Sequence, residues 1–281
     1  MSDHSHFLTR ALSPKPFAVI LGANEIASAI AVYLHRNGCG VVLSHDPSPP
    51  VFKRGMSFHG ALFGDHAAID EISAERVETS LEVLSALSRA NVVAITPLGL
   101  SDLLVLRRLD LIIDARLQGP AQRPDLRNLA RFAIGLGPGF ASGVNCDVAL
   151  SAPSRRAAIP VGGDAREPRK LLERFVYADS RGLWQTAVDL GSRAFRGFVV
   201  GHVHGAPVSA LIDGILVGVA RDGSEVVEGD ILAEVEPRTR QAIWTGMDKA
   251  GRSTASAVMR VIQDYADRRE NSNSTISQRS P

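Results

Sequence analysis

A short apolar run near the start of the chain, FAVIL at 17–21, leads into residues whose types could bind a nucleotide. A dinucleotide-binding loop has glycine at its first, third and sixth positions, so that the backbone can approach a pyrophosphate. Here Gly22 keeps the first position, whereas Asn24 occupies the third, where its side chain would crowd a phosphate. Asp46 follows the next apolar run, where acidic residues commonly hold a ribose hydroxyl. Two interpretations stay open: a nucleotide-binding loop, or a nucleotide-free loop with a well-capped helix.

Two glycines flank a proline in the segment LGPGF at 136–140. The backbone amides around Gly137 and Gly139 could converge and form a nest that binds an anion. The same residues suit an ordinary turn, in which glycine adopts a positive φ and proline fixes its own. The segment alone does not distinguish these two interpretations.

A carboxylate and a guanidinium, Asp114 and Arg116, end the apolar run that begins at residue 109. They could form an ion pair between two loops, or they could serve a ligand or a reaction. Cys146 could handle sulfur or selenium as a reactive thiol, although a buried structural cysteine is the more common case. His202 and His204 alternate along one predicted strand without a third ligand nearby, which favours surface histidines. We therefore assign no catalytic residue and no metal site.

The first half of the chain alternates buried-strand patterns with helical spacing. Strands are predicted at 17–21, 41–44, 92–95, 110–114 and 132–136, and helices at 25–36, 74–90 and 101–109. This alternation predicts an α/β fold with a Rossmann-like, doubly wound parallel sheet over residues 16–150. Such sheets bind ligands at the carboxyl ends of their strands, which is where the candidate residues above lie.

The second half contains a short internal repeat. GSRAFRGFVVGHV at 191–203 matches GSEVVEGDILAEV at 223–235 with an offset of 32 residues. Between the copies, ALIDGILVGVA at 210–220 predicts a hairpin that bends at Asp213-Gly214. The pattern is similar to the barrel-sandwich hybrid of biotinyl and lipoyl carrier domains, here over 185–240. Because no lysine lies between Lys170 and Lys249, we expect no covalent biotin or lipoate, and instead a docking or structural unit.

The remaining segments complete the predicted domain organisation. We expect disorder at 1–15, a connecting segment at 151–184, a C-terminal helix at 241–268 and a disordered tail at 269–281. Apolar residues at helical spacing between Ala257 and Tyr265 predict that the helix packs on the rest of the protein.

Composition excludes several classes of protein. The 281 residues carry 31 Lys and Arg against 30 Asp and Glu, a net charge of +1 that provides no field for nucleic acid or an anionic membrane. Aromatic residues make up 5%, which argues against a base-stacking surface. The two cysteines cannot form a disulfide framework. With no signal peptide and no apolar run near the ~20 residues of a membrane span, we expect a cytoplasmic protein. The sequence is compatible with a homo-oligomer.

The order of motifs is more informative than any one of them. The chain resembles the YqeB-type accessory proteins of selenium-dependent molybdenum hydroxylase systems over roughly residues 16–265. The segments that carry this resemblance are VILGANEIASAIAVYLHRNG, FKRGMSF with GALFGD, LDLIIDARL, IGLGPGFASGVNCDVAL and SALIDGILVGVARDG with VVEGDILAEVEPR.

The resemblance implies a role in maturing or supplying a molybdenum hydroxylase, such as a xanthine-dehydrogenase-type enzyme, which would be the client partner. The candidate positions that it implies are Gly22, Arg54, Ser57, Asp114, Arg116, Gly137, Gly139, Phe140 and Asp147. Two departures stand out. The family's Gly-Ala-Gly-Asp-Leu entry reads GANEI at 22–26, and its Arg-Gly-His stretch is replaced by SRRAA at 154–158.

Three hypotheses follow. In the first, an accessory protein binds an anionic cofactor, a nucleotide or a molybdopterin-type ligand at the sheet edge, with Arg54 and Arg116 pairing with phosphates. Arg116→Ala would then weaken binding with little loss of stability. In the second, the chain is a nucleotide-dependent oxidoreductase or a nucleotidyl transferase on the same fold. In the third, it is a non-catalytic scaffold that docks partners through the repeat module.

Overall fold

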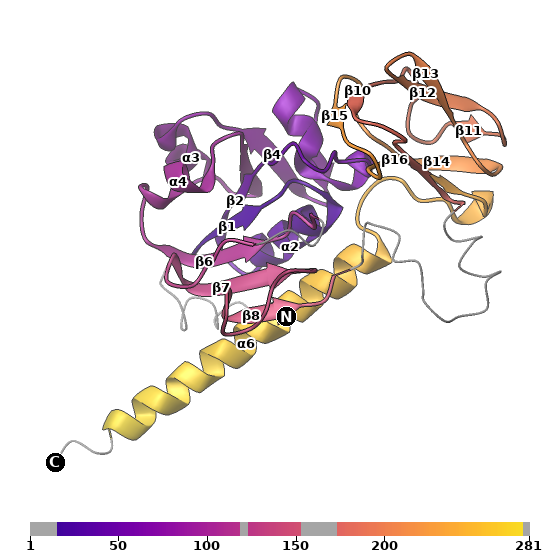
Figure 1. Ribbon diagram of the computed structural model, residues 1–281. Coiled ribbons are helices and arrows are strands. Elements are labelled where there is room, and N and C mark those ends of the chain that lie inside the picture. The colour runs from indigo at the N-terminus through magenta and orange to yellow at the C-terminus, as the bar shows by residue number, and fades with distance from the viewer. Residues whose placement is uncertain (1–15, 119–122, 153–172, 278–281) are drawn as a thin grey trace, which may run out of the picture.

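The computed structural model describes residues 16–118, 123–152 and 173–277 (Figure 1). An eight-stranded sheet has the order β3-β4-β5-β2-β1-β6-β7-β8. All its strand pairs are parallel except β3–β4. The strands are β1 Phe17–Leu21, β2 Gly40–Ser44, β3 Ala68–Ile69, β4 Ile72–Arg76, β5 Val92–Thr96, β6 Leu109–Asp114, β7 Ala130–Leu136 and β8 Val148–Leu150. The mixed α/β architecture with a Rossmann-like, largely parallel sheet confirms that part of the prediction.

Helices cover both faces of this sheet. On one face, α2 (Glu25–Arg36) and α6 (Lys249–Ser277) share a core with Ala18 and Ile20 of β1. On the other face, α3 (Ser80–Ala86) and α4 (Leu100–Leu104) pack with the alternate β1 residues, Phe17 and Val19 among them. Both faces of β1 are therefore buried, which explains why the FAVIL run is apolar throughout.

Two predicted helices are wrong in their extent. The predicted helix at 74–90 is instead β4 followed by the shorter α3, because Ala74 pairs with Val93 in the parallel sheet. Thr79 then starts α3 through a capping box with Glu82. Similarly, α4 ends at Leu104, before the predicted end at residue 109, because Leu109 is the first residue of β6.

A β module, residues 175–236, follows the parallel sheet. It consists of two four-stranded sheets, ordered β13-β12-β10-β15 and β11-β14-β16-β9, around a core that includes the fully buried Trp184. The strands are β9 Phe175–Tyr177, β10 Gly182–Gln185, β11 Arg193–Ala194, β12 Val199–Val203, β13 Ala206–Ser209, β14 Gly214–Val219, β15 Glu225–Val226 and β16 Ile231–Glu236. Figure 1 shows the module beside the carboxyl edge of β2 and β4.

The internal repeat appears in the β module as a reciprocal exchange of hydrogen bonds. The Gly191 amide donates to the Leu216 carbonyl at 2.8 Å, and the Gly223 amide donates to the Trp184 carbonyl at 2.8 Å. Gly191 and Gly223 have φ values of 82° and 78°. The acceptors Trp184 and Leu216 are themselves 32 residues apart. Each copy of the repeat therefore donates an equivalent hydrogen bond to the other copy.

The segment between β2 and η1 (Arg54–Met56) joins the two parts of the protein. Phe52 packs in the core of the β module, and its carbonyl accepts from the Val219 amide at 2.7 Å. A methyl group at Gly55 would overlap the carbonyl oxygen of Trp244, so this position requires glycine. The β module is thus fixed to the sheet by a segment from the first third of the chain.

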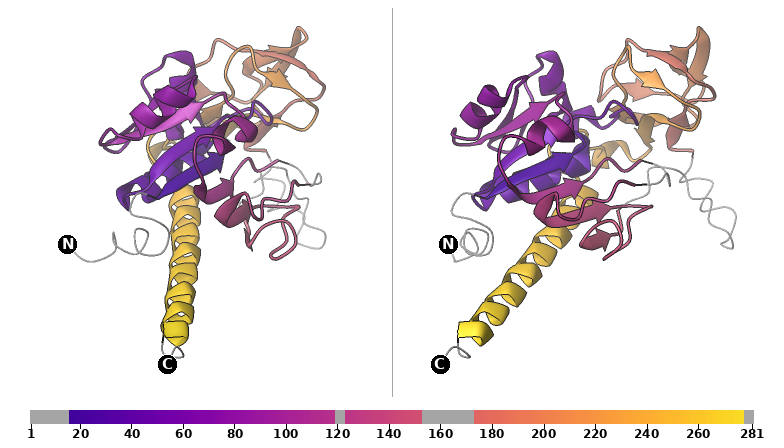
Figure 2. Two further views of the ribbon diagram at one scale, coloured as in Figure 1. Left: turned by 90° about the vertical axis from the view of Figure 1, so that its left-hand side faces the viewer. Right: turned by 60° about the vertical axis from the view of Figure 1, so that its left-hand side comes forward.

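The C-terminal helix differs from the prediction at both ends. It begins at Lys249, where Asp248 accepts from the Gly251 amide at 2.7 Å, and not at 241, because Gly246 with a φ of 77° interrupts the helical backbone. It continues to Ser277 across nine residues, 269–277, of the predicted disordered tail, since each added residue of an established helix gains a backbone hydrogen bond. Figure 2 shows the end of α6 extending beyond the sheet.

Some expectations fall outside the described residues. These are the predicted disorder at 1–15, the last four residues of the predicted tail and most of the predicted connecting segment. Among the helices that the structure describes, none has the length and apolar character needed to cross a membrane.

Candidate functional site

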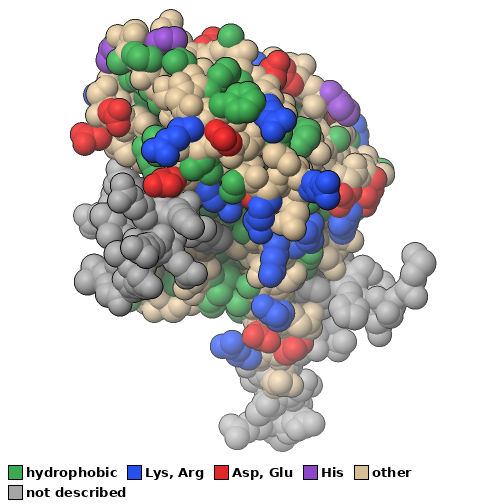
Figure 3. All heavy atoms as spheres, turned by 90° about the vertical axis from the view of Figure 1, so that its right-hand side faces the viewer, with side chains coloured by type: hydrophobic (Ala, Val, Ile, Leu, Met, Phe, Trp, Pro, Cys, Tyr) green, Lys and Arg blue, Asp and Glu red, His purple; other side chains and the backbone are tan. Residues whose placement is uncertain are grey.

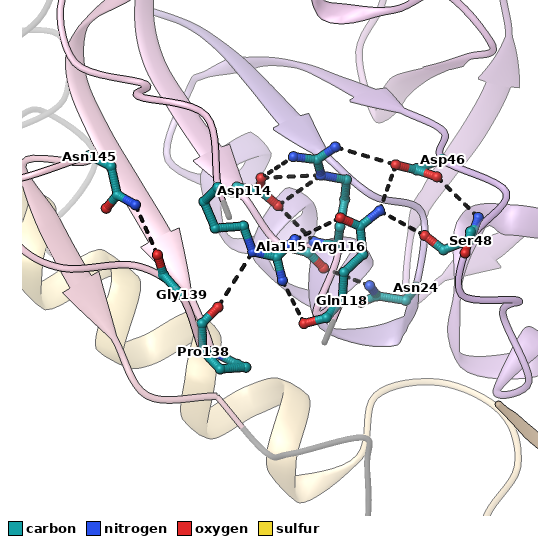
Figure 4. A network of polar contacts seen from close by, with 11 residues as sticks. Asn24, Asp46, Ser48, Asp114, Ala115, Arg116, Gln118, Pro138, Gly139 and Asn145 are labelled. Atoms are coloured by element: carbon teal, nitrogen blue, oxygen red, sulfur yellow. Dashed lines mark hydrogen bonds and ion pairs between the residues drawn. The ribbon is translucent and has the colours of Figure 1, made fainter. Parts of the chain in front are cut away.

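The order of the strands defines a switch point at the carboxyl edge of the sheet. From β1 the chain forms β2, β3, β4 and β5 on one side, and it then returns to add β6 on the other side of β1. The loops that follow β1 and β6 therefore leave the sheet in opposite directions, and ligands of such folds bind in the crevice between them. Gly22 and Asn24 follow β1, Asp114 ends β6, and Arg116 follows it. Gly22 packs against the backbone of Ala115 and Arg116. Asn24 bonds the Ala115 carbonyl beside Asp114 and Arg116 (Figure 4).

Asn24 fills the place that a phosphate would take. Its Oδ1 accepts from the Ile26 and Ala27 amides at 3.0 Å each, and its Nδ2 donates to the Ala115 carbonyl at 2.6 Å. The side chain is 3% exposed. The amides at the start of α2 are therefore satisfied from within the protein. Gly22, with a φ of 113°, is required because a Cβ atom would lie 3.0 Å from the Ala115 carbonyl oxygen.

Arg116 is paired with carboxylates. Its Nε lies 3.1 Å from both oxygens of Asp114, and its guanidinium also contacts Asp46 at 3.3 Å. Burial acts to lower the pKa of Arg116, but the hydrogen bond and attraction to Asp114, with a contribution from Asp46, raise the pKa above its ordinary value. The side chain of Asp114 is 1% exposed. This pairing neutralises both groups at the switch point.

The glycine turn predicted at 136–140 is tied to the same network. Gln118 donates to Asp46 at 2.8 Å and accepts from Arg123 at 2.6 Å. Arg123 in turn donates to the Pro138 carbonyl at 3.4 Å and lies 5.6 Å from the centre of the Phe140 ring. Gly137 and Gly139 have φ values of 87° and 86°, as their positions in the turn require.

The other predicted residues lie elsewhere. Asp147 accepts from the Ala133 amide at 2.7 Å, and Ser57 donates to the Arg54 carbonyl at 3.1 Å. The Arg54 Nε donates to the Val219 carbonyl of the β module at 2.7 Å. Cys146 is buried, and burial raises the pKa of its thiol, which fits a structural cysteine.

A cleft of about 630 Å³ opens further along the same edge of the sheet, and sequence reasoning missed it. Its floor is formed by residues that follow β2 and β5, its side by η2 (Phe58–Phe63), and its roof by the β module. The lining residues are His45, Pro47, Ser48, Pro50, Val51, His59, Leu62, Phe63, Arg76, Pro97, Arg181, Arg221, Asp222, Gly223, Ser224, Glu225, Val226, Val227 and Asp230. The one feature of the sequence that could have indicated this cleft is His45, which directly follows the strand β2.

Two histidines meet in this cleft. The rings of His45 and His59 have their centres 5.1 Å apart, and each Nδ1 is buried without a hydrogen-bond partner. Burial is the main cause that lowers the pKa of both, for His59 to about 3. The charges of Arg221 and Arg54 lower the pKa of His59 further. Both imidazoles are therefore neutral at pH 7.

Basic and apolar groups share the cleft. Arg221 lies over the ring of Phe63, 4.1 Å from its centre, and pairs with Asp65 at 2.6 Å. Arg181 is an exposed lining residue. Two of the acidic lining residues accept hydrogen bonds from backbone amides. Asp222 accepts from the Thr186 amide at 2.8 Å, and Asp230 accepts from the Val227 amide at 2.9 Å. The arrangement suits a molecule with an apolar body and an anionic group.

The structure shows no cluster for metal binding in residues 16–118, 123–152 and 173–277. No three His, Cys, Asp or Glu side chains within these ranges are placed to hold a metal ion.

Comparison with known proteins gives one informative match among curated sequences. YqeB of Escherichia coli strain K12, an uncharacterized protein, is 25% identical over 256 residues, which are 87% of this chain and 47% of that protein. The chain is similar to YqeB. It spans about half the length of this curated relative, and the similarity supports a YqeB-type family. No family model matches the chain.

Solved structures give only distant matches. A succinylglutamate desuccinylase/aspartoacylase from Rhodobacter sphaeroides is 10% identical, with 79% of this chain and 84% of that chain covered and a TM-score of 0.25. The product-bound ectoine utilization protein EutE (DoeB) from Ruegeria pomeroyi is 12% identical, with 79% and 85% covered and a TM-score of 0.23. Scores this low carry no argument about fold or activity.

Proposed function

We propose that this chain is an accessory protein of a molybdenum hydroxylase and holds a small anionic ligand, such as a nucleotide or a pterin, in the cleft between the sheet and the β module. The order of motifs shared with YqeB-type proteins supports the accessory role. The observation that carries ligand binding is the cleft itself, with a volume of about 630 Å³ and Arg181 and Arg221 on its walls. That volume lies within the usual range for small-molecule sites.

The cleft suits an anion better than the switch point does. At the switch point, the guanidiniums of Arg116 and Arg123 are offset by the carboxylates of Asp114 and Asp46, so no positive charge is left over for an anionic ligand. Among the charges that act on His59, the two guanidiniums of Arg54 and Arg221 outnumber the carboxylate of Asp65. We therefore place the ligand at the carboxyl edge of the sheet, in the region beside His59 and not at Arg116.

We also propose that the β module belongs to the barrel-sandwich type and covers the cleft. The reciprocal hydrogen bonds of its two repeats support this assignment, and so does its side-by-side placement with the sheet (Figure 1). Since the chain lacks a lysine between residues 170 and 249, the module would act as a lid or docking unit without a covalent cofactor.

Native mass spectrometry of the full chain tests the proposed function. The protein would be incubated with ATP, CTP, NADP and a reduced pterin, and we expect a mass shift for one bound anionic ligand per chain. Arg221→Gln should weaken that binding at least tenfold, because the charge that faces the ligand is lost.

Arg240→Gln is the matched control, since Arg240 is exposed and does not line the cleft. It should leave binding unchanged. A mass that stays at the value of the unliganded chain with every ligand would contradict the proposed function.

A surface feature favours a second candidate, a scaffold that docks a client enzyme through the β module. Phe195, Phe198, Val199 and Leu211 are all exposed, with Phe195 at 54%. Figure 3 shows hydrophobic side chains among charged ones on the face that includes this module. Exposed apolar side chains grouped on one module are typical of protein-binding surfaces. The oxidoreductase and transferase hypotheses stay predictions from the sequence.

A further inference from the structure

The facing histidines of the cleft are left unexplained by packing alone. His59 is 4% exposed, and its Nδ1 and the Nδ1 of His45 are buried without a hydrogen-bond partner. A buried polar atom without a partner costs about 1–3 kcal/mol, so each such atom calls for an explanation, for example a catalytic role or a bound water or ion. Both residues line the same cleft, so the feature points to a ligand that would interact with this pair.

The charges that face His59 come from three parts of the protein. His45 lies on the sheet side, Arg54 and Asp65 lie before and after η2, and Arg221 projects from the β module. The Asp46 carboxylate adds a negative charge beside His45. In the absence of a ligand, burial, the neighbouring His45 and the two guanidiniums oppose a proton on His59. A dianion that entered among these groups would reverse the balance, because it would attract both the guanidiniums and a protonated imidazole.

The rest of the lining defines the body of the ligand. Phe63 is half-exposed under the guanidinium of Arg221, and Val51, Leu62 and Pro97 add apolar surface. A planar ring could pack against this surface while its charged group meets Arg221 and the histidines. Phosphate monoesters carry close to two negative charges near neutral pH, since their second pKa is about 6.

We propose that the cleft binds a phosphate monoester of a planar heterocycle, and that the His45–His59 pair takes up one proton from solvent when the phosphate enters. This proposal rests on the proposed function and deepens it. No covalent bond forms or breaks: one solvent proton moves to an imidazole nitrogen, and the imidazolium is balanced by the second negative charge of the phosphate. Affinity above pH 7 should therefore rise up to about tenfold for each pH unit lowered.

Isothermal titration calorimetry with the full chain tests the proposal. Adenosine 5′-monophosphate, adenosine and inorganic phosphate are the probes, in Tris and HEPES buffers at pH 7.5, whose ionisation enthalpies differ. We expect the monophosphate to bind at least tenfold more tightly than either part alone, with uptake of about one proton per site. His59→Gln and His45→Gln should each weaken binding and abolish the uptake, whereas His202→Gln, an exposed change on β12, should alter neither.

The possible failures are distinguishable. Binding of the monophosphate without proton uptake, or uptake that persists in both histidine variants, would overturn the inference and leave the proposed function standing. Absence of binding for all three probes would also overturn the inference, and the proposed function would fall only if native mass spectrometry found no anionic ligand either. If His59→Gln does not fold, as circular dichroism would reveal, His45→Gln and Arg221→Gln decide the question.

Discussion

Two Asp-x-Arg pairs in this protein have the same local geometry and different surroundings. Arg116 bonds Asp114, and Arg127 bonds Asp125, in each case through the backbone amide, Nε and Nη2 of the arginine. The carboxylate of Asp114 is 1% exposed, whereas that of Asp125 is 49% exposed. The pairs therefore separate the effect of burial from that of hydrogen bonding.

We expect Arg116→Ala to lower the free energy of unfolding by about 3 kcal/mol, because it leaves the buried Asp114 carboxylate without its cation. Arg127→Ala should lower the free energy of unfolding much less, as solvent screens the exposed pair. Urea unfolding monitored by circular dichroism measures both. Equal losses of unfolding free energy in the two variants would contradict this expectation. A loss of ligand affinity in Arg116→Ala with unchanged stability would favour the phosphate-binding role that the sequence predicts for Arg116.

The candidate residues could be predicted in part from the sequence. Asp114 and Arg116 were placed correctly at the end of a strand, because strand and loop patterns are local. What surrounds them could not be predicted, since the partner carboxylate of Asp46 lies 70 residues away from Arg116 in the chain. The His45–His59 pair was missed for the same reason. Its histidines belong to different elements, and nothing in their spacing indicates that the rings meet.

At the scale of elements, continuous apolar runs were the most reliable signal. The runs at 17–21 and 110–114 are central strands, buried on both faces, so their pattern needs no knowledge of their neighbours. The segment 72–86 was harder, because β4 lies near the sheet edge with half-buried residues whose pattern resembles a helix. Tertiary pairing with β5 overrides that local preference.

The connection between β2 and η2 yields a prediction of its own. Gly55→Ala should destabilise the protein by about 1–3 kcal/mol, because the added methyl group would overlap the Trp244 carbonyl and push the segment out of place. Gly99→Ala is the control, since a methyl group there meets only the Asp102 side chain at 3.6 Å. Thermal unfolding compares the two variants. A similar melting temperature for both variants would show that the connection between β2 and η2 can shift without loss of stability.

At the scale of the whole molecule, the β module faces the cleft on one side and solvent on the other. If the solvent side docks a client, a Phe195→Ser/Phe198→Ser double variant should bind a purified xanthine-dehydrogenase-type enzyme at least tenfold more weakly, since apolar contacts are lost. Sedimentation velocity measures the complex. Leu81→Ser, which changes a residue of α3 that is 79% exposed, is the control. Equal binding by both variants would remove support for this surface.

The packing of Phe52 and Arg54 against the β module has a consequence for synthesis on the ribosome. The Arg54 Nε bonds a carbonyl that lies 165 residues later in the chain. A growing chain therefore completes β1 to β8 while Phe52 still lacks the core that will bury it. The side of α2 that packs against α6 also stays uncovered until α6 has been made. The nascent protein thus carries unburied apolar surface until the β module and then α6 have been made, and in that period a chaperone would have most to protect.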